Sequence, residues 1–429
     1  MKILFAATPA SGHVNPLIAI ARMVIDRGDE VSFTTGQHFA SAVEAAGARF
    51  IPLAAEANLD LTKLADLFPE RAALTNGPDQ LRFDFERIFL DTMAAQAETL
   101  RNFITDEAPD IIITEGQFLG RLPLMLDTGR SRPPIIVCGV SFLMLDRLDG
   151  APAGPGLPPA RNDEEHRRYS NIASDFDAVF ANPVRAYADA KLAALGLPAL
   201  PYSITQSSVL MADAYLHSTV PAFEYDFGAL PPSIHFVGAL PALGGTPPPE
   251  WWGDLDGPQR IVLVTQGTAA NSDFTQLVEP TLAALAHRSD LLVVVTTGGR
   301  PINAIMGPIP ANARLAPFLD FEMLFPKIDL LVTNGGYGTV SLALRAGVPI
   351  VAAGRSEDKA EVGARVAWSG VGVEITTSTP SVLELRHAIE EVLSNDSFKV
   401  KADKLAAEFA RFNSKDLILA VIDDMVAIG

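Results

Sequence analysis

The sequence predicts an α/β protein with two doubly wound parallel sheets. Short apolar runs typical of buried parallel strands alternate with helical patterns, and this alternation starts again after residue 257. The chain has 429 residues, which is too long for one core and suits two domains of roughly 200 residues each. Because alternating strands and helices form parallel sheets covered by helices, we expect two Rossmann-like units.

The first predicted domain covers residues 1–237. It opens with a strand at Ile3–Ala7, a helix at Leu17–Arg27 ended by Gly28, and a second strand at Glu30–Thr35. Further strands are predicted at Ile111–Thr114, Pro134–Val140 and Ala214–His217, and helices at 79–107 and 164–173. Residues 151–159 are rich in Pro and Gly, which predicts a flexible loop.

A linker and a second domain follow. Residues 238–257 contain Gly-Gly-Thr-Pro-Pro-Pro and two tryptophans, a composition typical of a linker. The second domain, residues 258–395, is predicted to have strands starting at Arg260 and at 291–296, 330–333, 348–353 and 371–375, and helices at 276–287, 340–345, 357–369 and 383–393. Residues 396–429 form an amphipathic helical segment.

The most informative motif is a glycine-rich turn between the strand Leu330–Thr333 and a short helix. It reads Asn334-Gly335-Gly336-Tyr-Gly338-Thr339. A turn of this kind directs unpaired backbone N–H groups and the positive end of a helix dipole toward one point, which suits a phosphate group. The same pattern also occurs in ordinary tight turns of α/β proteins, so the motif needs support from elsewhere in the chain.

A second motif follows the first strand, where the chain reads Gly12-His13-Val-Asn-Pro16. The pairing of an early Gly-His-x-x-Pro with a late Val-Thr-Asn-Gly-Gly-x-Gly-Thr resembles the nucleotide-sugar-dependent glycosyltransferases that act on small lipophilic molecules. These family 1 enzymes have the GT-B fold, two Rossmann-like domains facing across a cleft, and include bacterial macrolide and plant flavonoid glycosyltransferases. The resemblance extends over essentially the whole chain, and it implies that the C-terminal segment crosses back to the first domain.

The resemblance implies roles for two residues of the first domain. The family histidine at the position of His13 is the general base, a role that suits an imidazole with a pKa near neutrality. An aspartate after a later strand assists it in the family, and the matching position here holds Glu115, which is one methylene longer. Transfer by such a base inverts the anomeric centre.

The resemblance also implies a donor site in the second domain. Asn334 stands where the family usually has histidine, so phosphate binding depends more on the backbone of Gly338 and Thr339. Leu342 stands where the family often has a ribose-binding glutamate, which keeps a dTDP-sugar possible beside a UDP-sugar. The expected donor-binding residues are Gln266, Thr268, Phe318 as the base-stacking ring, Asn334, Gly335, Gly336, Gly338, Thr339, Asp358 and Lys359.

Acceptor specificity is expected from the first domain, where aromatic and methionine side chains indicate an apolar or aromatic acceptor. Side chains of this kind at helical spacing are also common in cores. The candidates are Phe85, Phe89, Phe118, Phe142 and Met144.

Composition restricts the partners. A net charge of −18 disfavours nucleic acids and anionic membranes, and we expect a cytoplasmic protein whose partners are a nucleotide sugar and a small hydroxyl acceptor. Asp175-Phe-Asp177 and Asp254-Leu-Asp256 match the Asp-x-Asp pattern of metal-dependent glycosyltransferases. The first lies far from the glycine turn in sequence and the second lies in the linker, so we expect no metal and no cofactor.

Two alternatives remain open at this point. The departures at Glu115, Asn334 and Leu342 allow a catalytically degenerate partner protein that binds nucleotide sugars. An epimerase or a lipid-linked-sugar transferase of similar architecture is the second alternative, and acceptor choice would distinguish it.

Overall fold

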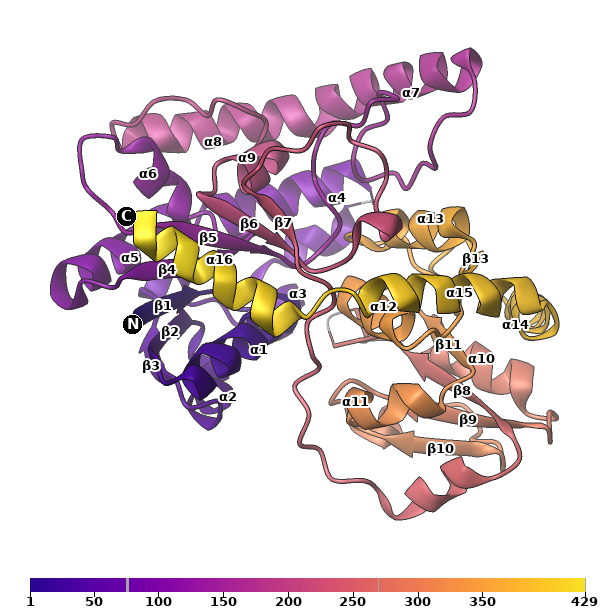
Figure 1. Cartoon of the computed structure of the whole chain (residues 1–429). Coiled ribbons are helices and arrows are strands. Elements are labelled where there is room, and N and C mark those ends of the chain that lie inside the picture. The colour runs from indigo at the N-terminus through magenta and orange to yellow at the C-terminus, as the bar shows by residue number, and fades with distance from the viewer. Residues whose placement is uncertain (75–76, 269, 429) are drawn as a thin grey trace.

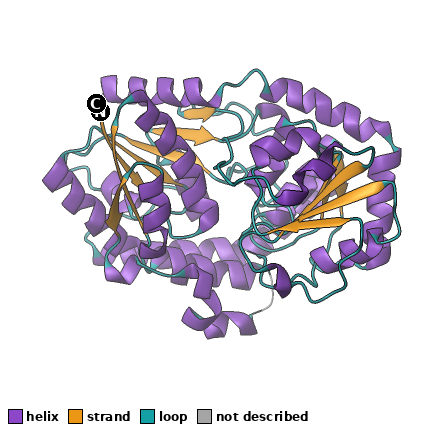
Figure 2. Cartoon of the chain, turned by 90° about the horizontal axis from the view of Figure 1, so that it is seen from below, coloured by secondary structure: helices purple, strands orange, loops and turns teal. Residues whose placement is uncertain are grey.

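The fold was obtained as a computed structural model, which describes residues 1–74, 77–268 and 270–428. Two sheets lie side by side, and every strand pair in both sheets is parallel (Figure 1). Helices cover both faces of each sheet (Figure 2). The predicted α/β class with two doubly wound sheets is therefore confirmed.

The first sheet has the strand order β3-β2-β1-β4-β5-β6-β7. Its central strands β1 and β4 are adjacent, with Phe5 opposite Ile113, although residues 7–110 separate them in sequence. The direction of strand order reverses between these two strands, and ligands of open α/β sheets bind at such reversals. The strands are β1 (Lys2–Ala6), β2 (Glu30–Thr35), β3 (Arg49–Pro52), β4 (Ile111–Glu115), β5 (Ile135–Gly139), β6 (Ala214–His217) and β7 (Ile234–Phe236).

The second sheet repeats this arrangement with the order β10-β9-β8-β11-β12-β13. Here the reversal lies between β8 and β11, where Thr265 is paired with Thr333. The glycine turns that follow these two strands therefore lie next to each other. The strands are β8 (Arg260–Thr265), β9 (Leu291–Thr296), β10 (Ala313–Ala316), β11 (Leu330–Thr333), β12 (Ile350–Ala352) and β13 (Gly372–Glu374).

Helices pack on these sheets through apolar faces, giving an apolar cluster on each face of each sheet. The first domain has α1 (Ser11–Arg27), α2 (Ala40–Ala45), α3 (Leu64–Leu67), α4 (Pro78–Phe83), α5 (Met93–Glu107), α6 (Arg121–Leu126), α7 (Asp163–Phe176), α8 (Asn182–Ala194) and α9 (Ile204–Leu210). The second has α10 (Val278–Leu285), α11 (Phe321–Leu324), α12 (Tyr337–Arg345), α13 (Lys359–Ser369), α14 (Val382–Ser394) and α15 (Asp396–Phe409). None of the helices in the described ranges is both long and apolar enough to cross a membrane.

The last helix, α16 (Ser414–Ile428), lies on the first domain. Its buried side chains Ile418 and Ile422 join the apolar cluster between α1 and the sheet, and Arg27 of α1 forms an ion pair with Asp423 at 2.7 Å. The preceding helix α15 packs against α12 of the second domain instead. As a result, the end of α16 lies beside the start of β1 (Figures 1 and 2).

Candidate active site

His13 lies in the first turn of α1, directly beyond the carboxyl end of β1. Ala10 precedes the helix in an extended conformation, so the chain turns sharply here and places His13 at the strand reversal of the first sheet. The side chain is about one-fifth exposed, and its Nδ1 lies 2.8 Å from Oε2 of Glu115. The structure thus brings together the two residues proposed as the catalytic pair.

Glu115 is the last residue of β4 and is fully buried. One carboxylate oxygen accepts the backbone N–H of Thr8 at 3.0 Å, and the other accepts that of Gln117 at 2.7 Å as well as the His13 ring. An ionised carboxylate can only accept hydrogen bonds, so Nδ1 of His13 is the donor. This leaves Nε2 of His13 as the ring nitrogen that can accept a proton.

The electrostatics of the pair follow from its burial and its opposite charges. Burial would lower the pKa of His13, but the charge and hydrogen bond of Glu115, with a smaller contribution from Asp358, outweigh burial and raise it. Burial would raise the pKa of Glu115, but the interactions with His13 and Thr8 lower it overall. Glu115 is thus the ionised partner of an imidazole whose proton affinity is increased.

Asp358 is the residue of the second domain whose charge acts on His13. It is the residue before α13, and its Oδ2 accepts a 2.6 Å hydrogen bond from the hydroxyl of Ser141, which follows β5 of the first domain. Burial raises the pKa of Asp358 above its ordinary value, against the opposing effects of Lys359 and Ser141. Sequence reasoning missed Ser141, because a lone serine after a strand carries no signal of a contact with a residue in the other domain.

The two glycine turns of the second domain lie at the reversal between β8 and β11. Gly335 (φ 95°) and Gly267 (φ 68°) adopt left-handed conformations that favour glycine. Gly336 precedes α12, and a Cβ atom added at Gly336 or Gly338 would meet nothing within 4 Å. The first helical hydrogen bond of α12 is donated by Val340, so the N–H groups before it point out of the helix toward open space.

Two of the expected donor-binding side chains hold these turns together instead. Nδ2 of Asn334 donates to the carbonyl of Gln266 at 2.7 Å, which ties the turn after β11 to the turn after β8. The amide of Gln266 is bonded to Asp273 O and to the N–H of Val278. Both side chains are buried, and their amide N–H groups donate to backbone carbonyls.

Other donor-side candidates are accessible. Thr268 is exposed and Thr339 is partly exposed. The ring of Phe318 is 52% exposed and lies against Gly299 of the loop after β9, where a Cβ atom would meet the ring at 2.6 Å. An aromatic face held this way beside the turns is suited to stacking on a base.

Lys359 is the first residue of α13, but unlike an exposed lysine at a helix start it is not free in solvent. It is buried, and its Nζ forms an ion pair with Glu357. Glu357 adopts φ 50°, a left-handed conformation that is strained for a residue with a side chain. Backbone strain next to Asp358 is a feature that no sequence pattern indicated.

The acceptor candidates divide into two groups. Phe118 is fully buried in the core of the first domain, and Phe142 is buried beneath the guanidinium of Arg365. These rings fill cores because they follow directly on buried strands, so neither offers a surface to an acceptor. Phe89 is partly exposed with its ring centroid 6.2 Å from that of His13, and Met144 is also partly exposed.

Phe85 lies behind Phe89. It is buried and packs edge-on against Phe89 and Phe180. It supports the acceptor side and does not line it.

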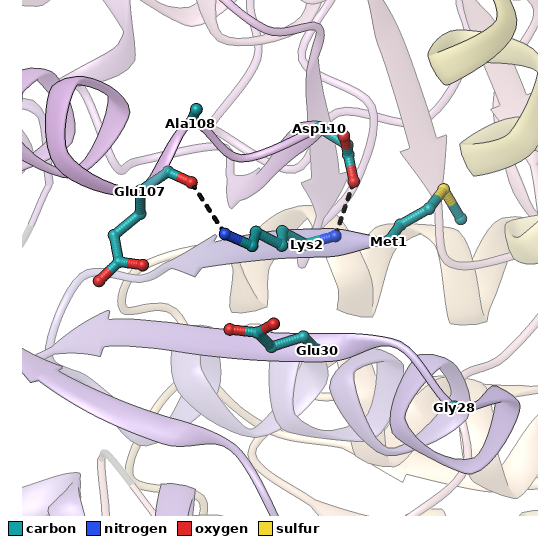
Figure 3. A pocket seen from close by; sticks show the side chains of 7 residues that line it. All are labelled: Met1, Lys2, Gly28, Glu30, Glu107, Ala108 and Asp110. Carbon is teal, nitrogen blue, oxygen red and sulfur yellow. Dashed lines mark hydrogen bonds between the residues drawn. The ribbon is translucent and has the colours of Figure 1, made fainter.

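A hollow of about 540 Å³ lies at the opposite edge of the first sheet, at the amino ends of β1 and β2. Figure 3 shows its wall, where the backbone N–H of Lys2 donates to Asp110 at 2.7 Å and its Nζ reaches the carbonyl of Glu107 at 3.5 Å. Ligands of parallel sheets bind at the carboxyl ends of strands. The hollow is therefore separate from the site around His13.

The linker residues that match Asp-x-Asp are paired with basic side chains. Asp254 forms an ion pair with Arg314 at 2.5 Å, and Asp256 forms one with Lys327. Within residues 1–74, 77–268 and 270–428, no group of three or more His, Cys, Asp or Glu side chains is arranged to hold a metal ion.

The chain has two Rossmann-like sheets, and in each a loop suited to ligand binding follows the strands at the reversal of strand order. This arrangement defines the GT-B class of glycosyltransferases. The glycosyltransferase VinC, solved in complex with DTDP, superimposes with a TM-score of 0.70 and 18% identity over the full length of both chains. The match shows the shared fold. Residues 280–421 match the family model described as erythromycin biosynthesis protein CIII-like, C-terminal domain.

Sequence comparison extends this relationship to the whole chain. It is 37% identical over 424 residues to the 4'-demethylrebeccamycin synthase of Lentzea aerocolonigenes, with 98% of each chain covered. It is 35% identical over 447 residues to UDP-glycosyltransferase 2 of Phaeomoniella chlamydospora, covering 99% of this chain and 96% of that protein. The chain belongs to the family 1 glycosyltransferases, and it is a nucleotide-sugar-dependent glycosyltransferase that acts on small molecules.

Proposed function

We propose that the protein is an inverting glycosyltransferase that moves a hexose from a nucleoside diphosphate sugar to a hydroxyl group of a small apolar or aromatic acceptor. The observation that carries the proposal is the hydrogen bond between His13 and the buried Glu115 at the strand reversal of the first sheet. Asp358 of the second domain contributes to the charge around the same imidazole, so the pair faces the donor side.

In the proposed step, the acceptor hydroxyl donates its proton to Nε2 of His13 while its oxygen attacks the anomeric carbon. The bond from that carbon to the diphosphate oxygen breaks on the opposite face, and the diphosphate leaves with the bonding electrons. An α-linked donor therefore yields a β-glycoside. Glu115 holds the ring through Nδ1 and stabilises the imidazolium that forms, as the acidic member of a hydrolase triad does.

The leaving diphosphate is bound by backbone N–H groups at the start of α12 and by the dipole of that helix. Gly338 and Thr339 supply the most accessible of these groups. Phe318 stacks on the base and Asp358 accepts a hydrogen bond from the sugar. We favour UDP because one relative is named a UDP-glycosyltransferase, and dTDP is the second possibility because VinC was solved with DTDP.

On the acceptor side, Phe89 provides apolar surface beside His13, and the partly exposed Met144 lies next to Gln117, the residue whose N–H bonds Glu115. Aromatic rings and methionine form adaptable apolar surfaces that suit flat or hydrophobic molecules. This chemistry favours phenols and lipophilic alcohols over charged acceptors.

The test is a panel of UDP- and dTDP-sugars with phenolic and aliphatic alcohol acceptors, scored separately for transfer and for donor hydrolysis. We expect a β-glycoside product from an α-linked donor, formed equally well in the presence of a chelator. Retention of the α-configuration would contradict the mechanism. Donor binding without transfer to any acceptor would favour the degenerate partner protein, and loss of transfer in chelator with recovery in Mg²⁺ or Mn²⁺ would favour a metal-dependent step.

A further inference from the structure

The segment 150–160 lies in the connection between β5 and α7 and contains the Pro- and Gly-rich residues 151–159. The composition of residues 151–159 predicts a flexible loop, yet the structure holds this segment at several points. At its base, Asp149 accepts the backbone N–H groups of Ala151 at 3.1 Å and Ala160 at 2.9 Å. The hydroxyl of Tyr169 donates to Pro158 O at 2.8 Å. These bonds fold the segment into a closed loop on the first domain.

The tip of this loop is bound by the second domain. The backbone N–H groups of Gly154 and Gly156 both donate to Oε1 of Glu361, at 2.8 and 3.0 Å, and Arg355 donates to Pro155 O at 3.0 Å. Glu361 lies in the first turns of α13, the helix that begins directly after Asp358. One carboxylate oxygen of the donor-side helix therefore accepts two backbone N–H groups from the tip of a loop of the acceptor-side domain.

The carboxylate of Glu361, which holds the loop, is itself fixed by burial and by ion pairs. Its side chain is 2% exposed, and its other oxygen accepts a 2.8 Å hydrogen bond from Arg365. Arg365 in turn is paired at 2.9 Å with Glu224 of the first domain, and Glu224 is bonded to His217 at 2.9 Å. A buried carboxylate that is paired and hydrogen-bonded has one fixed position, so it offers the loop a single docking geometry.

We propose that Glu361 is a positioning residue that clamps the segment 150–160 onto the second domain, so that the acceptor is enclosed only while the two domains are in contact through this loop. The inference rests on the proposed function, because it assigns the space enclosed by the loop to the acceptor. Ser141, which bonds Asp358, lies earlier in the same connection between β5 and α7. The clamp therefore connects the acceptor loop to the start of α13 at two separate places, and closing it excludes water from the reaction.

The chain offers a matched pair of variants for the test. Gly156 and Gly150 have nearly the same left-handed backbone, with φ of 72° and 74°, so alanine causes similar backbone strain at both positions. A Cβ atom at Gly156 would lie 2.3 Å from the carbonyl oxygen of Ala360 in α13, whereas one at Gly150 would lie 3.5 Å from Ser170 Oγ. Gly156→Ala therefore pushes the loop off α13, and Gly150→Ala does not.

The first readout is hydrogen exchange of the segment 150–160 in the free full-length protein. We expect Gly156→Ala to lose protection there while Gly150→Ala keeps it. The second readout is steady-state transfer, where Gly156→Ala should raise the acceptor KM by about tenfold or more, because two hydrogen bonds to a buried carboxylate are lost. The donor KM should be unchanged, and the ratio of donor hydrolysis to transfer should rise.

Equal behaviour of the two variants in both readouts would overturn the clamp. If the wild-type protein transferred no sugar at all, the proposed function would fail, but the exchange experiment would still decide the clamp. A rise in donor KM equal to that in acceptor KM would also overturn it, because that result would place the loop on the donor.

Discussion

The proposed catalytic pair, His13 and Glu115, shows which site residues a sequence can indicate. His13 follows the central strand β1 and Glu115 ends the neighbouring central strand β4. The carboxyl ends of parallel strands meet at one edge of the sheet, so the two positions in sequence predict their proximity. The backbone N–H groups of Thr8 and Gln117 that fix Glu115 are invisible in sequence, because any residue carries them. The bond from Ser141 to Asp358 was equally hidden, since it joins two domains.

We predict that His13→Ala lowers turnover by about 10²–10⁴-fold with donor binding retained, because a positioned base contributes about that factor. The loss should be largest on aliphatic alcohols and smaller on acidic phenols, which lose a proton more easily. Steady-state kinetics on both acceptor types, with calorimetry for the donor, measures this. His166→Ala, an exposed histidine on α7, is the control, and near wild-type turnover of His13→Ala on an aliphatic alcohol would place the base elsewhere.

We also predict the pH dependence of kcat/KM. The base must be neutral to accept a proton, and the pKa of His13 is raised above its ordinary value of 6.5. Activity should therefore rise with pH through a midpoint above 6.5. In Glu115→Gln the raising charge is gone and burial lowers the pKa, so the midpoint should move to lower pH while turnover falls. A midpoint that stays in place in this variant would show that another group titrates.

At the scale of elements, central strands were predicted and three of the edge strands were missed. β3, β7 and β10 each lie at the end of a sheet, where one side is open to solvent, and their side chains are partly exposed. They therefore lack the continuous apolar run that marks a buried parallel strand. Sequence pattern reports burial on both faces, so these three edge strands escaped it, whereas the edge strand β13 (Gly372–Glu374) was predicted within the apolar run at 371–375.

At the scale of elements, we predict that the start of α12 binds the diphosphate of the donor. Gly338→Val should weaken donor binding by about tenfold or more, because a branched side chain would occupy the open space in front of the N–H groups. The fold should be unaffected, since a Cβ atom at Gly338 meets nothing within 4 Å. Gly253→Val is the matched control, because that glycine has equally open surroundings away from the turns. Calorimetry with UDP and dTDP measures the effect, and unchanged affinity would place the diphosphate elsewhere.

At the scale of the molecule, side chains of each domain pack into the apolar core of the other. Phe142, Val220 and Phe223 of the first domain pack into the main apolar cluster of the second. In the opposite direction, α16 belongs by packing to the first domain although it follows the second in sequence. The family resemblance indicated the crossing, but periodicity alone did not separate α15 from α16, because both helices are amphipathic.

We predict that Ile422→Ala lowers the free energy of unfolding of the first domain by about 2–5 kcal/mol, the range for deleting a buried branched side chain. Ile422 is fully buried against α1 and the sheet. Leu417→Ala on the same helix is the control, because Leu417 is 37% exposed and its loss should cost within about 0.5 kcal/mol. Denaturant unfolding followed by a probe in the first domain measures both, and equal costs would contradict this docking of α16.

The return of α16 has a consequence for biosynthesis. A ribosome synthesises the first domain, then all of the second, and only afterwards the helix that covers α1. At about 5–20 residues per second, the nascent first domain exposes the apolar surface later covered by Ile418 and Ile422 for on the order of ten seconds or more. That surface is a natural site for chaperone binding during translation. Ribosome-bound chains stalled before residue 414 should bind a hydrophobic dye more strongly than chains stalled after α16 has emerged.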